Sequence, residues 1–384
     1  MNKSLRVLII CTLVGLFAAM STGVYAGNKD RSGQAGAQHL LIDPWARSNG
    51  WGTAGVAEIR GLESIYSNVA GMAFTNKTQV GFSRVQYLSG SGAGIAVNTF
   101  GLSQALFSKD KETGRRLKDF GVLGVSAFIM KFGDIPITTT DQPEGNMGTF
   151  SPSMNYIGIH YAKSFNNFIH GGVSIKVVTE TGSSDCRAMG VAIDAGVQYL
   201  SGAYENFKIG LTMKNIGLPM SYKGDGLSVR GVVNNTSHEL TLEQRSAEYE
   251  LPSLLTIGLS YDFLIWTGEY KNMSKDDRID EGLTRNDAEH RITLAGSFTA
   301  NSFSRDIFAF GIEYGFRKFF MIRAGYAIEG GMWKTSTCTT WYTGPSAGIT
   351  FAIPIKNTRL LLDYAYRFTN KWKGNHYIGL KFEM

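Results

Sequence analysis

The histidines of this chain are the first candidates for acid–base or metal chemistry. The six lie far apart in the sequence, at His39, His160, His170, His238, His290 and His376. None forms an HExxH pair, which would place two metal ligands on one helix face. The pattern GxSxG occurs once, at Gly344–Gly348, but it lies within the predicted strand 343–355 and so forms no strand-to-helix turn that exposes a nucleophilic serine. His290 and Ser297 share one predicted strand but point to opposite faces of it. The sequence therefore predicts no catalytic residue, no metal site and no enzyme activity.

Two short motifs allow other chemistry, and each has a simpler interpretation. GSGAG at Gly90–Gly94 has the glycines of a dinucleotide loop, but no helix follows it, so a tight turn is expected. An acidic run could attract a divalent cation, but EF-hand spacing is absent and a solvated loop is expected. That run consists of Asp276, Asp277, Asp280 and Glu281. No cofactor is predicted.

Four single charges lie on stretches that are otherwise apolar or small, namely Glu313, Arg323, Asp363 and Arg367. The stretch Asp306–Ile328 positions the first two. Its large residues recur at every second position, and Ala, Gly and the charges occupy the alternate ones. This period of two predicts an antiparallel hairpin. A soluble sandwich would bury the large residues, whereas a membrane barrel turns them towards lipid and keeps a small or polar lumen.

The composition decides between these two alternatives. The chain has 46 Gly, 23 Phe and 17 Tyr but only 8 Pro. Residues 1–26 combine the positive Lys3 and Arg6, an apolar stretch at 7–20 and small residues at 24–26, which is typical of a secretory signal peptide. No later run of about 18 apolar residues is present for a transmembrane helix. An exported chain of this kind is predicted to be an all-β, transmembrane antiparallel β-barrel of the outer membrane.

Charge and cysteine content narrow the partners further. The formal net charge of +6 falls to +4 once Lys3 and Arg6 leave with the signal peptide (6 − 2), and the excess is scattered. No nucleic-acid partner is therefore predicted. The mature chain keeps Cys186 and Cys338, too few for a disulfide framework. Both fall in predicted outer loops, where we expect two free thiols. The alternative is a disulfide, since this setting is oxidising, but it requires the two loops to fold across the barrel mouth.

Fourteen alternating stretches follow residue 78, an even number as a single-chain bacterial barrel requires. The predicted strands are 79–88, 92–107, 119–132, 153–164, 168–180, 188–199, 206–216, 252–264, 289–300, 306–317, 319–329, 343–355, 358–369 and 374–384. The long connections fall at the outer end, at 133–152, 181–187, 217–251 and 330–342. The short ones fall at the periplasmic end, with 265–288 as a long, charged exception.

The segment before the first strand is predicted to fill the lumen. Leu40–Phe74 lacks alternation and is too apolar for a free tail. A ring of this size is wider than side chains alone can fill, so residues 27–77 are expected to form a lead-in and a plug, ahead of a barrel over 78–384. Its residues Arg47, Glu58, Arg60 and Glu63 are expected to pair with the four lumen charges. The alternative is a cap packed beneath the barrel.

Loop 217–251 is the predicted partner-contact surface. It carries five apolar residues, Leu218, Met220, Tyr222, Leu227 and Val229, before the polar run 234–250. A loop of this length without regular structure is uncommon unless it has a function. Addition of a partner's strand is one physical route to such a contact. The alternative is a loop folded over its own barrel mouth.

Several of these stretches together resemble the PorV/PorQ family, which are FadL-like outer-membrane barrels of fourteen strands. The resemblance rests on residues 42–58, 65–74, 190–199, 210–226, 250–263 and 311–326. The chain departs from the family at Asn68-Val69-Ala70, where Asn-Pro-Ala is usual, and at Trp51-Gly52, where Met-Gly is usual. Proline would stiffen the first of these turns, so its absence bears on the geometry around Asn68.

The resemblance implies a component of the type IX secretion system, more PorV-like than PorQ-like. Such a protein would bind the C-terminal signal domain of secreted cargo and hand it from the translocon to the sortase, with outer-membrane lipid around the barrel. The alternative is a FadL-like channel for hydrophobic small molecules, with a moving plug and a lateral opening. Opposite charges in the lumen favour a fixed plug, and hence the first function.

Overall fold

The computed structural model describes residues 31–89, 94–109, 116–183, 185–232, 239–271, 273–334, 338–356, 358–370 and 373–384. The predicted signal peptide, residues 1–26, lies outside the described residues. Within these ranges, no helix is long and apolar enough to cross a membrane.

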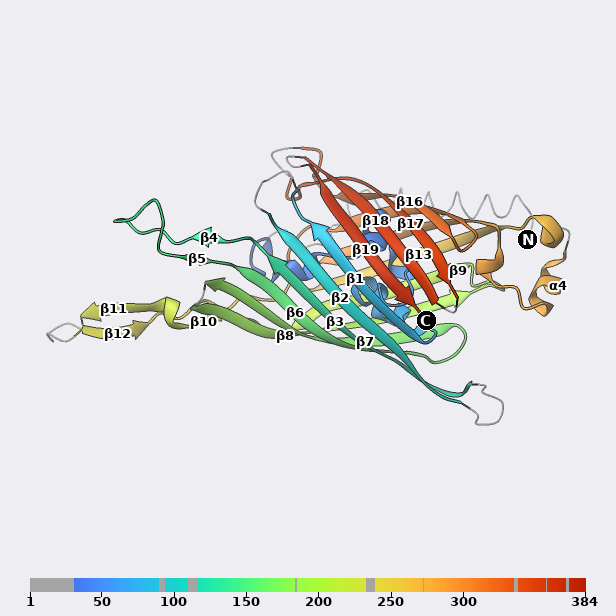
Figure 1. The fold of residues 1–384 in the computed structure, drawn as a ribbon, viewed down its shortest axis with the longest axis horizontal. Coiled ribbons are helices and arrows are strands. Elements are labelled where there is room, and N and C mark those ends of the chain that lie inside the picture. Colours follow the sequence, from blue (N-terminus) through green and yellow to red (C-terminus); the bar gives the residue numbers. More distant parts are fainter. Residues whose placement is uncertain are drawn as a thin grey trace.

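One antiparallel sheet closes on itself to form a barrel (Figure 1). The sheet has 15 strands, and the 14 that remain when the short β10 is set aside make a closed ring. The ring closes where β1 pairs with β19, from Gln79–Glu383 to Gln86–His376. The barrel strands are β1 (Thr78–Gln86), β2 (Ala96–Lys109), β3 (Arg116–Lys131), β6 (Ser153–Ser164), β7 (Ile169–Ser183), β8 (Cys186–Ser201), β9 (Phe207–Gly217), β13 (Leu254–Ile265), β14 (His290–Asn301), β15 (Ile307–Phe316), β16 (Phe320–Glu329), β17 (Tyr342–Ile355), β18 (Thr358–Thr369) and β19 (Asn375–Glu383). The predicted strand number and fold class are confirmed.

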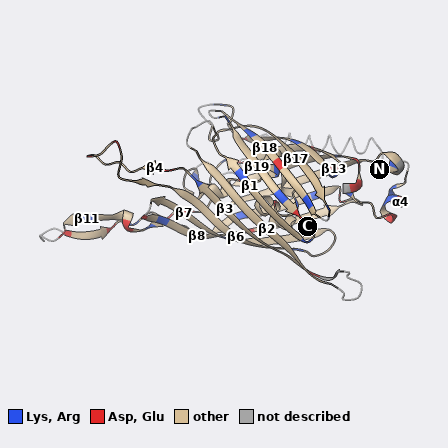
Figure 2. Cartoon of the chain, viewed as in Figure 1, with Lys and Arg blue, Asp and Glu red and all other residues tan. Residues whose placement is uncertain are grey.

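The two faces of the wall follow the predicted alternation. On β15, Phe310, Ile312 and Tyr314 are exposed on the outer face, while Ala309 and Glu313 are buried on the inner face. Most of the strand ribbon visible in Figure 2 carries no charged residue. An apolar outer face around a polar lumen is the arrangement of a membrane barrel, because no water is available at membrane depth to solvate charges.

The long connections lie at the end of the barrel opposite the C-terminus. They contain β4 (Ile135–Pro136), β5 (Thr149–Phe150), β10 (Tyr222–Lys223), η5 (Asp225–Leu227), β11 (Ser228–Val232) and β12 (Glu239–Glu243). Figure 1 shows β4, β5, β11 and β12 projecting well beyond the wall. The predicted long loop at 181–187 is wrong, because β7 and β8 continue pairing through Thr181–Arg187 to Ser183–Cys186.

The end that carries the C-terminus has short turns and one long segment. Residues 266–289 join β13 to β14 there and contain η6 (Gly268–Lys271), α4 (Lys275–Asp280) and η7 (Arg285–Asp287). Outer-membrane barrels turn short connections towards the periplasm and long loops outwards. This end is therefore the periplasmic one, and residues 266–289 are the exception that the sequence predicted.

The N-terminal segment, which we define as residues 31–77, runs through the lumen (Figure 1). It contains η2 (Gln38–Leu41), α2 (Ala46–Gly50), η3 (Gly55–Ala57), α3 (Ser64–Ser67) and η4 (Val69–Phe74). At the outer end, Gly36 N donates to Glu250 O at 3.0 Å. Deeper in, α2 packs on β17 and β18, η3 on β9 and β13, and η4 on β6, β7 and β8.

Glycines on the inner face of the wall leave room for the backbone of this segment. A Cβ at Gly325 would lie 2.2 Å from Trp51 C, and one at Gly311 would lie 2.6 Å from the Trp51 ring. A Cβ at Gly210 would lie 2.6 Å from Val56 O. Since real Cβ atoms do not approach so closely, the segment packs directly on a glycine bed formed by Gly172, Gly196, Gly210, Gly311 and Gly325. The Asn68 side chain lies over Gly196, and backbone atoms of the segment lie over the other four.

Replacing Gly325 by valine is therefore expected to expel Trp51 from its seat while leaving the strand ladder intact. The Gly325→Val protein should still show heat-dependent mobility in SDS, but its N-terminal segment should become sensitive to protease. The matched control is Ala324→Val, which adds bulk to the lipid-facing side of the same strand. Equal protease resistance in both variants would contradict the claim that Gly325 makes room for Trp51 on the wall.

Candidate functional site

A cluster of four buried charges holds the N-terminal segment at the periplasmic end. Glu58, at the end of η3, accepts from Lys208 of β9 through Oε2 and from Arg285 Nη2 of η7 through Oε1, the latter at 2.5 Å. Asp262 of β13 accepts from Lys208 Nζ at 2.7 Å and lies 3.2 Å from Arg285 Nε. Two carboxylates and two cations balance, so the cluster carries no net charge.

Each charged group of this cluster depends on its oppositely charged partners. Burial by itself would raise the pKa of the Glu58 carboxyl, but Arg285 and Lys208 outweigh burial and hold that pKa well below its usual range. Removing one partner from a buried ion cluster leaves an uncompensated charge, which costs about 3–5 kcal/mol. Glu58 is 1% exposed, so water cannot replace a lost partner.

Two further ion pairs join the segment to the wall. Arg60 Nη2 lies 2.7 Å from Glu205 Oε2 in the turn between β8 and β9. Glu63 Oε2 accepts from Lys381 Nζ of β19 at 3.2 Å. Together with Glu58, these residues show that the segment is fixed on several sides of the ring.

The predicted partners of these charges are wrong. Glu313 accepts from Arg291 Nη2 at 2.6 Å and from Arg323 Nε, so the wall strands β14, β15 and β16 pair with one another. Asp363 accepts from Thr350, and Arg367 donates to Asn49 Oδ1 at 3.3 Å. Glu58, Arg60 and Glu63 instead use Lys208, Arg285, Glu205 and Lys381. No ion pair of Arg47 occurs among the described residues.

Asn68 caps η4 and also ties it to the wall. Its Oδ1 accepts from Ala70 N at 3.1 Å, which caps the helix N-terminus. Its Nδ2 lies 3.0 Å from Val197 O on β8 and 3.3 Å from Leu211 O on β9. One side chain thereby connects the segment to two neighbouring strands.

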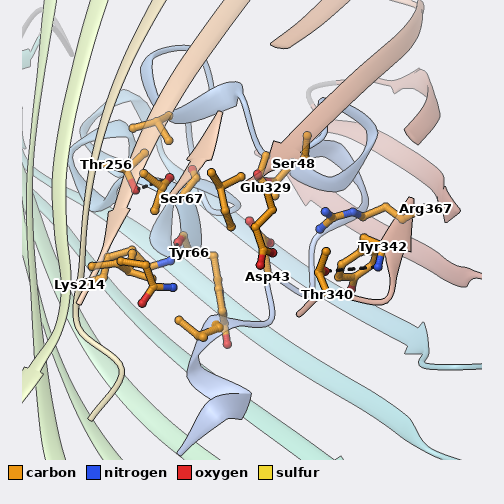
Figure 3. Close-up of a pocket in the computed structure, with 18 of the residues that line it drawn as sticks. Asp43, Ser48, Tyr66, Ser67, Lys214, Thr256, Glu329, Thr340, Tyr342 and Arg367 are labelled. Carbon is orange, nitrogen blue, oxygen red and sulfur yellow. Dashed lines mark hydrogen bonds between the residues drawn. The ribbon is translucent and has the colours of Figure 1, made fainter. Parts of the chain in front are cut away.

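A cavity of about 230 Å³ remains between the segment and the wall at the outer end (Figure 3). Apolar side chains form much of its lining, including Val56, Leu254, Ile307, Ala327 and Met332. Polar groups reach it from several elements and are labelled in Figure 3: Asp43, Ser48, Tyr66, Ser67, Lys214, Thr256, Glu329, Thr340, Tyr342 and Arg367.

Most charged groups of this cavity already have partners. Lys214 Nζ donates to Tyr66 O at 2.5 Å, and the Arg367 guanidinium lies 3.8 Å from the centre of the Tyr342 ring. Asp43 accepts from Trp45 N at 2.9 Å, and burial raises the pKa of its carboxyl. The hydroxyls of Tyr66 and Ser67 are buried without a partner in the described part of the chain. They leave hydrogen-bonding capacity beside an apolar lining.

A second hollow, of about 290 Å³, lies in the wall beside this cavity. It is lined by Met213 and Ile216 of β9, by residues 253–255 and by residues 300–302. Pairing between β9 and β13 ends at Lys214–Leu254, so the upper part of β9 leaves its neighbour. Leu254 and Asn301 line both hollows. The lumen cavity and the wall hollow are therefore adjacent through these two residues.

The predicted contact loop is folded at its base. Met220 is 1% exposed and exchanges two backbone hydrogen bonds of 2.9 Å with Tyr249. Tyr222 and Tyr249 both donate to Glu180 Oε2, at 2.9 and 2.7 Å, and His39 of the N-terminal segment lies 3.4 Å from Glu180 Oε1. Met220 and Tyr222 thus anchor the loop to the lumen.

The tip of the loop is a free hairpin of β11 and β12. It pairs Val229 with Leu242 and Gly231 with Leu240, and these apolar side chains are about half exposed. Leu218 is 78% exposed beside the base, whereas Leu227 is half-buried. Among the described residues, β11 and β12 pair only with each other, so the outer edge of each strand is unpaired there. An isolated two-stranded hairpin is marginally stable in water.

The histidines considered as candidates for catalysis make structural contacts. His160 lies between Ser126 and Ser174, 2.8 and 2.7 Å from their hydroxyls, with all three buried. His290 bonds to the hydroxyl of Tyr314 on the outer face. Among the described residues, no three His, Cys, Asp or Glu side chains gather as metal ligands. Cys186 and Cys338 are both free thiols.

Solved structures share the barrel fold of this chain. Neither a protein-family model nor a curated protein matches the sequence. Among solved structures, the CymD monoaromatic hydrocarbon channel is similar with a TM-score of 0.51 at 12% identity, over 89% of this chain and 97% of that one. A TodX monoaromatic hydrocarbon channel mutant that lacks S2 and S3 has a TM-score of 0.50 at 12% identity, over 88% and 97%. A FadL homologue of Pseudomonas aeruginosa has 0.47 at 11% identity, over 88% and 97%.

These similarities agree with the apolar outer face and the closed ring. The chain is an integral protein of the outer membrane, and its fold is a closed antiparallel barrel of 14 strands. The CymD and TodX structures are both named as monoaromatic hydrocarbon channels. The PorV/PorQ resemblance has no matching family model behind it and stays a prediction.

Replacing Asn68 by alanine should loosen the N-terminal segment, because the hydrogen bonds of the Asn68 side-chain amide with η4 and with the wall are then lost. We expect a loss of about 2 kcal/mol in the free energy of unfolding from lipid vesicles, for buried hydrogen bonds worth about 1 kcal/mol each. Asn166→Ala is the control, since Asn166 caps only its own exposed turn. Equal free energies for the two variants would show that Asn68 is not an anchor.

Proposed function

We propose that the protein is an outer-membrane channel for small, largely apolar molecules. The observation that carries the proposal is the adjacency of the lumen cavity and the wall hollow through Leu254 and Asn301. A molecule that enters from outside would rest beside the N-terminal segment and leave sideways into the bilayer. Such an exit suits an apolar solute, because it avoids crossing the charged periplasmic half.

The size and lining of the cavity support this class of solute. An apolar cavity of about 150 Å³ admits a benzene molecule, and the lumen cavity is larger, at about 230 Å³. Val56, Leu254, Ile307 and Ala327 provide apolar contact, and binding sites of this kind use a few polar groups for orientation. The CymD and TodX proteins, whose folds are similar, are named as monoaromatic hydrocarbon channels.

The charged cluster at the periplasmic end explains why the exit would be lateral. Glu58, Lys208, Asp262 and Arg285 fill the space between the N-terminal segment and the wall. An apolar molecule that passed straight through would have to separate buried ion pairs, which is costly. The wall hollow offers exposed Met213, Ile216 and Leu255 instead.

Filling the cavity should stop transport. Ala327 is buried and lines the cavity on β16. The Ala327→Trp variant is expected to lower the uptake of labelled toluene by cells at least fivefold, because the indole occupies the space of the solute. The control is Ala324→Trp, which places the same side chain on the lipid-facing side of the same strand. If wild-type protein does not accelerate toluene uptake above that of cells lacking it, the channel function is wrong.

A second function is supported by the free hairpin at the tip of the outer loop. Its pairing edges and the apolar face of Val229, Leu240 and Leu242 suit strand addition by a partner protein. This is the feature expected of a type IX secretion component that holds the signal domain of secreted cargo. The hairpin is separate from the lumen, so the two functions use different parts of the molecule.

Removing only the hairpin tests this second function. Replacing residues 228–243 by a Gly-Ser linker should leave the barrel folded, because Met220, Tyr222 and Tyr249 keep the loop base in place. Surface display of secreted proteins should fall sharply, while toluene uptake should not change. Normal display by this variant would exclude the hairpin as the contact.

A further inference from the structure

The described residues of the connection 266–289, which are 266–271 and 273–289, form a folded element at the periplasmic mouth. α4 begins with a capping box between Ser274 and Asp277. The Tyr204 hydroxyl donates to Lys275 O at 3.2 Å, and the Arg278 guanidinium lies 5.1 Å from the Trp266 ring. The first contact holds the element against the turn between β8 and β9, and the second lies within the element. The contacts of α4 are nevertheless few and solvent-exposed, which is typical of parts that open at low cost.

One residue of this element reaches into the lumen. Arg285 lies on η7 and is 6% exposed, although most residues of α4 are exposed. It contacts Glu58 of the N-terminal segment and Asp262 of the wall. η7 is fixed on its other side by Asp287, which accepts from Lys318 at 2.8 Å in the turn between β15 and β16.

Arg285 differs from the other partners of the N-terminal segment in where its backbone lies. Lys208 and Lys381 belong to strands of the ring, and Glu205 to a short turn. The backbones of the two lysines cannot move without disturbing the ladder. Arg285 belongs to a segment outside the ladder, so it can withdraw while every strand stays paired.

We propose that residues 266–289 are a latch for the N-terminal segment, with Arg285 as the residue that couples them. With the latch in place, Glu58 has two cations and the segment is fixed. When the latch is displaced, Glu58 and Asp262 share Lys208 alone, and the segment can shift towards the periplasm. The proposal goes beyond solute transport, because it concerns the movement of the segment whichever molecule crosses the barrel.

Planar-bilayer recording of ion conductance tests the latch without reference to any solute. The intact protein is expected to stay closed, and the Arg285→Gln variant to open at least ten times as often. The control is Arg317→Gln, which breaks an exposed ion pair with Glu289 at the end of the same segment. It should behave as the intact protein does. Steady large conductance from the intact protein would overturn the latch.

A second measurement follows the N-terminal segment itself. In a Cys186→Ala/Cys338→Ala background, Ala57→Cys reports access to the buried side of η3 through a membrane-impermeant thiol reagent. Adding Arg285→Gln should speed its labelling at least tenfold in protein that keeps its heat-dependent SDS mobility. Glu58→Gln breaks the same tie and should have the same effect, which covers a failure of Arg285→Gln to insert. Closed, unlabelled protein in both variants would overturn the proposal.

The double variant Glu58→Gln/Arg285→Gln separates a latch from simple charge imbalance. It leaves Lys208 and Asp262 as a balanced pair, so imbalance is relieved while the tie stays broken. The latch predicts openings as frequent as in the single variants. A return to the closed state would show that only the unpaired charge mattered, and the latch would be wrong.

Discussion

The structure depends on fitting a second length of backbone inside a closed ring of strands. Fourteen strands enclose more space than their own inward side chains can fill, and the N-terminal segment occupies it. Backbone groups at this depth need partners within the protein. The glycine bed meets both demands, because Gly210, Gly311 and Gly325 let Val56 and Trp51 approach the wall closely. Larger residues there would hold the segment away and leave an open pore.

The buried charges fix the position of the N-terminal segment along the barrel. Shape alone would allow the segment several positions along a smooth bed, since glycines offer no side chains to interlock. Glu58, Arg60 and Glu63 each have a different partner on the ring, and only one placement satisfies all three. Such groups are retained for specificity where they add little net stability.

The sequence predicted the wall well and the lumen poorly, for one physical reason. Outward residues such as Phe310 and Ile312 face lipid, so their period of two is plain, and strand boundaries follow from it. Inward charges can reach any strand across the ring, so Glu63 gave no indication that it would meet Lys381. The inward glycines were visible as composition, but their contact with Trp51 depends on a fold that local pattern does not encode. Arg285 was hidden for the same reason, within a run of charges that resembles a solvated loop.

The pairing of Glu63 with Lys381 also has a consequence for how the chain reaches this state. The two residues are separated by 318 positions, and β19 pairs with β1 at the same place. Contacts between distant parts of a chain form late, because the intervening loop must first be closed. The seam between the first and last strands and the seating of the N-terminal segment are therefore completed in one step. A nascent chain that lacks its final strand would have neither a sealed wall nor a filled interior.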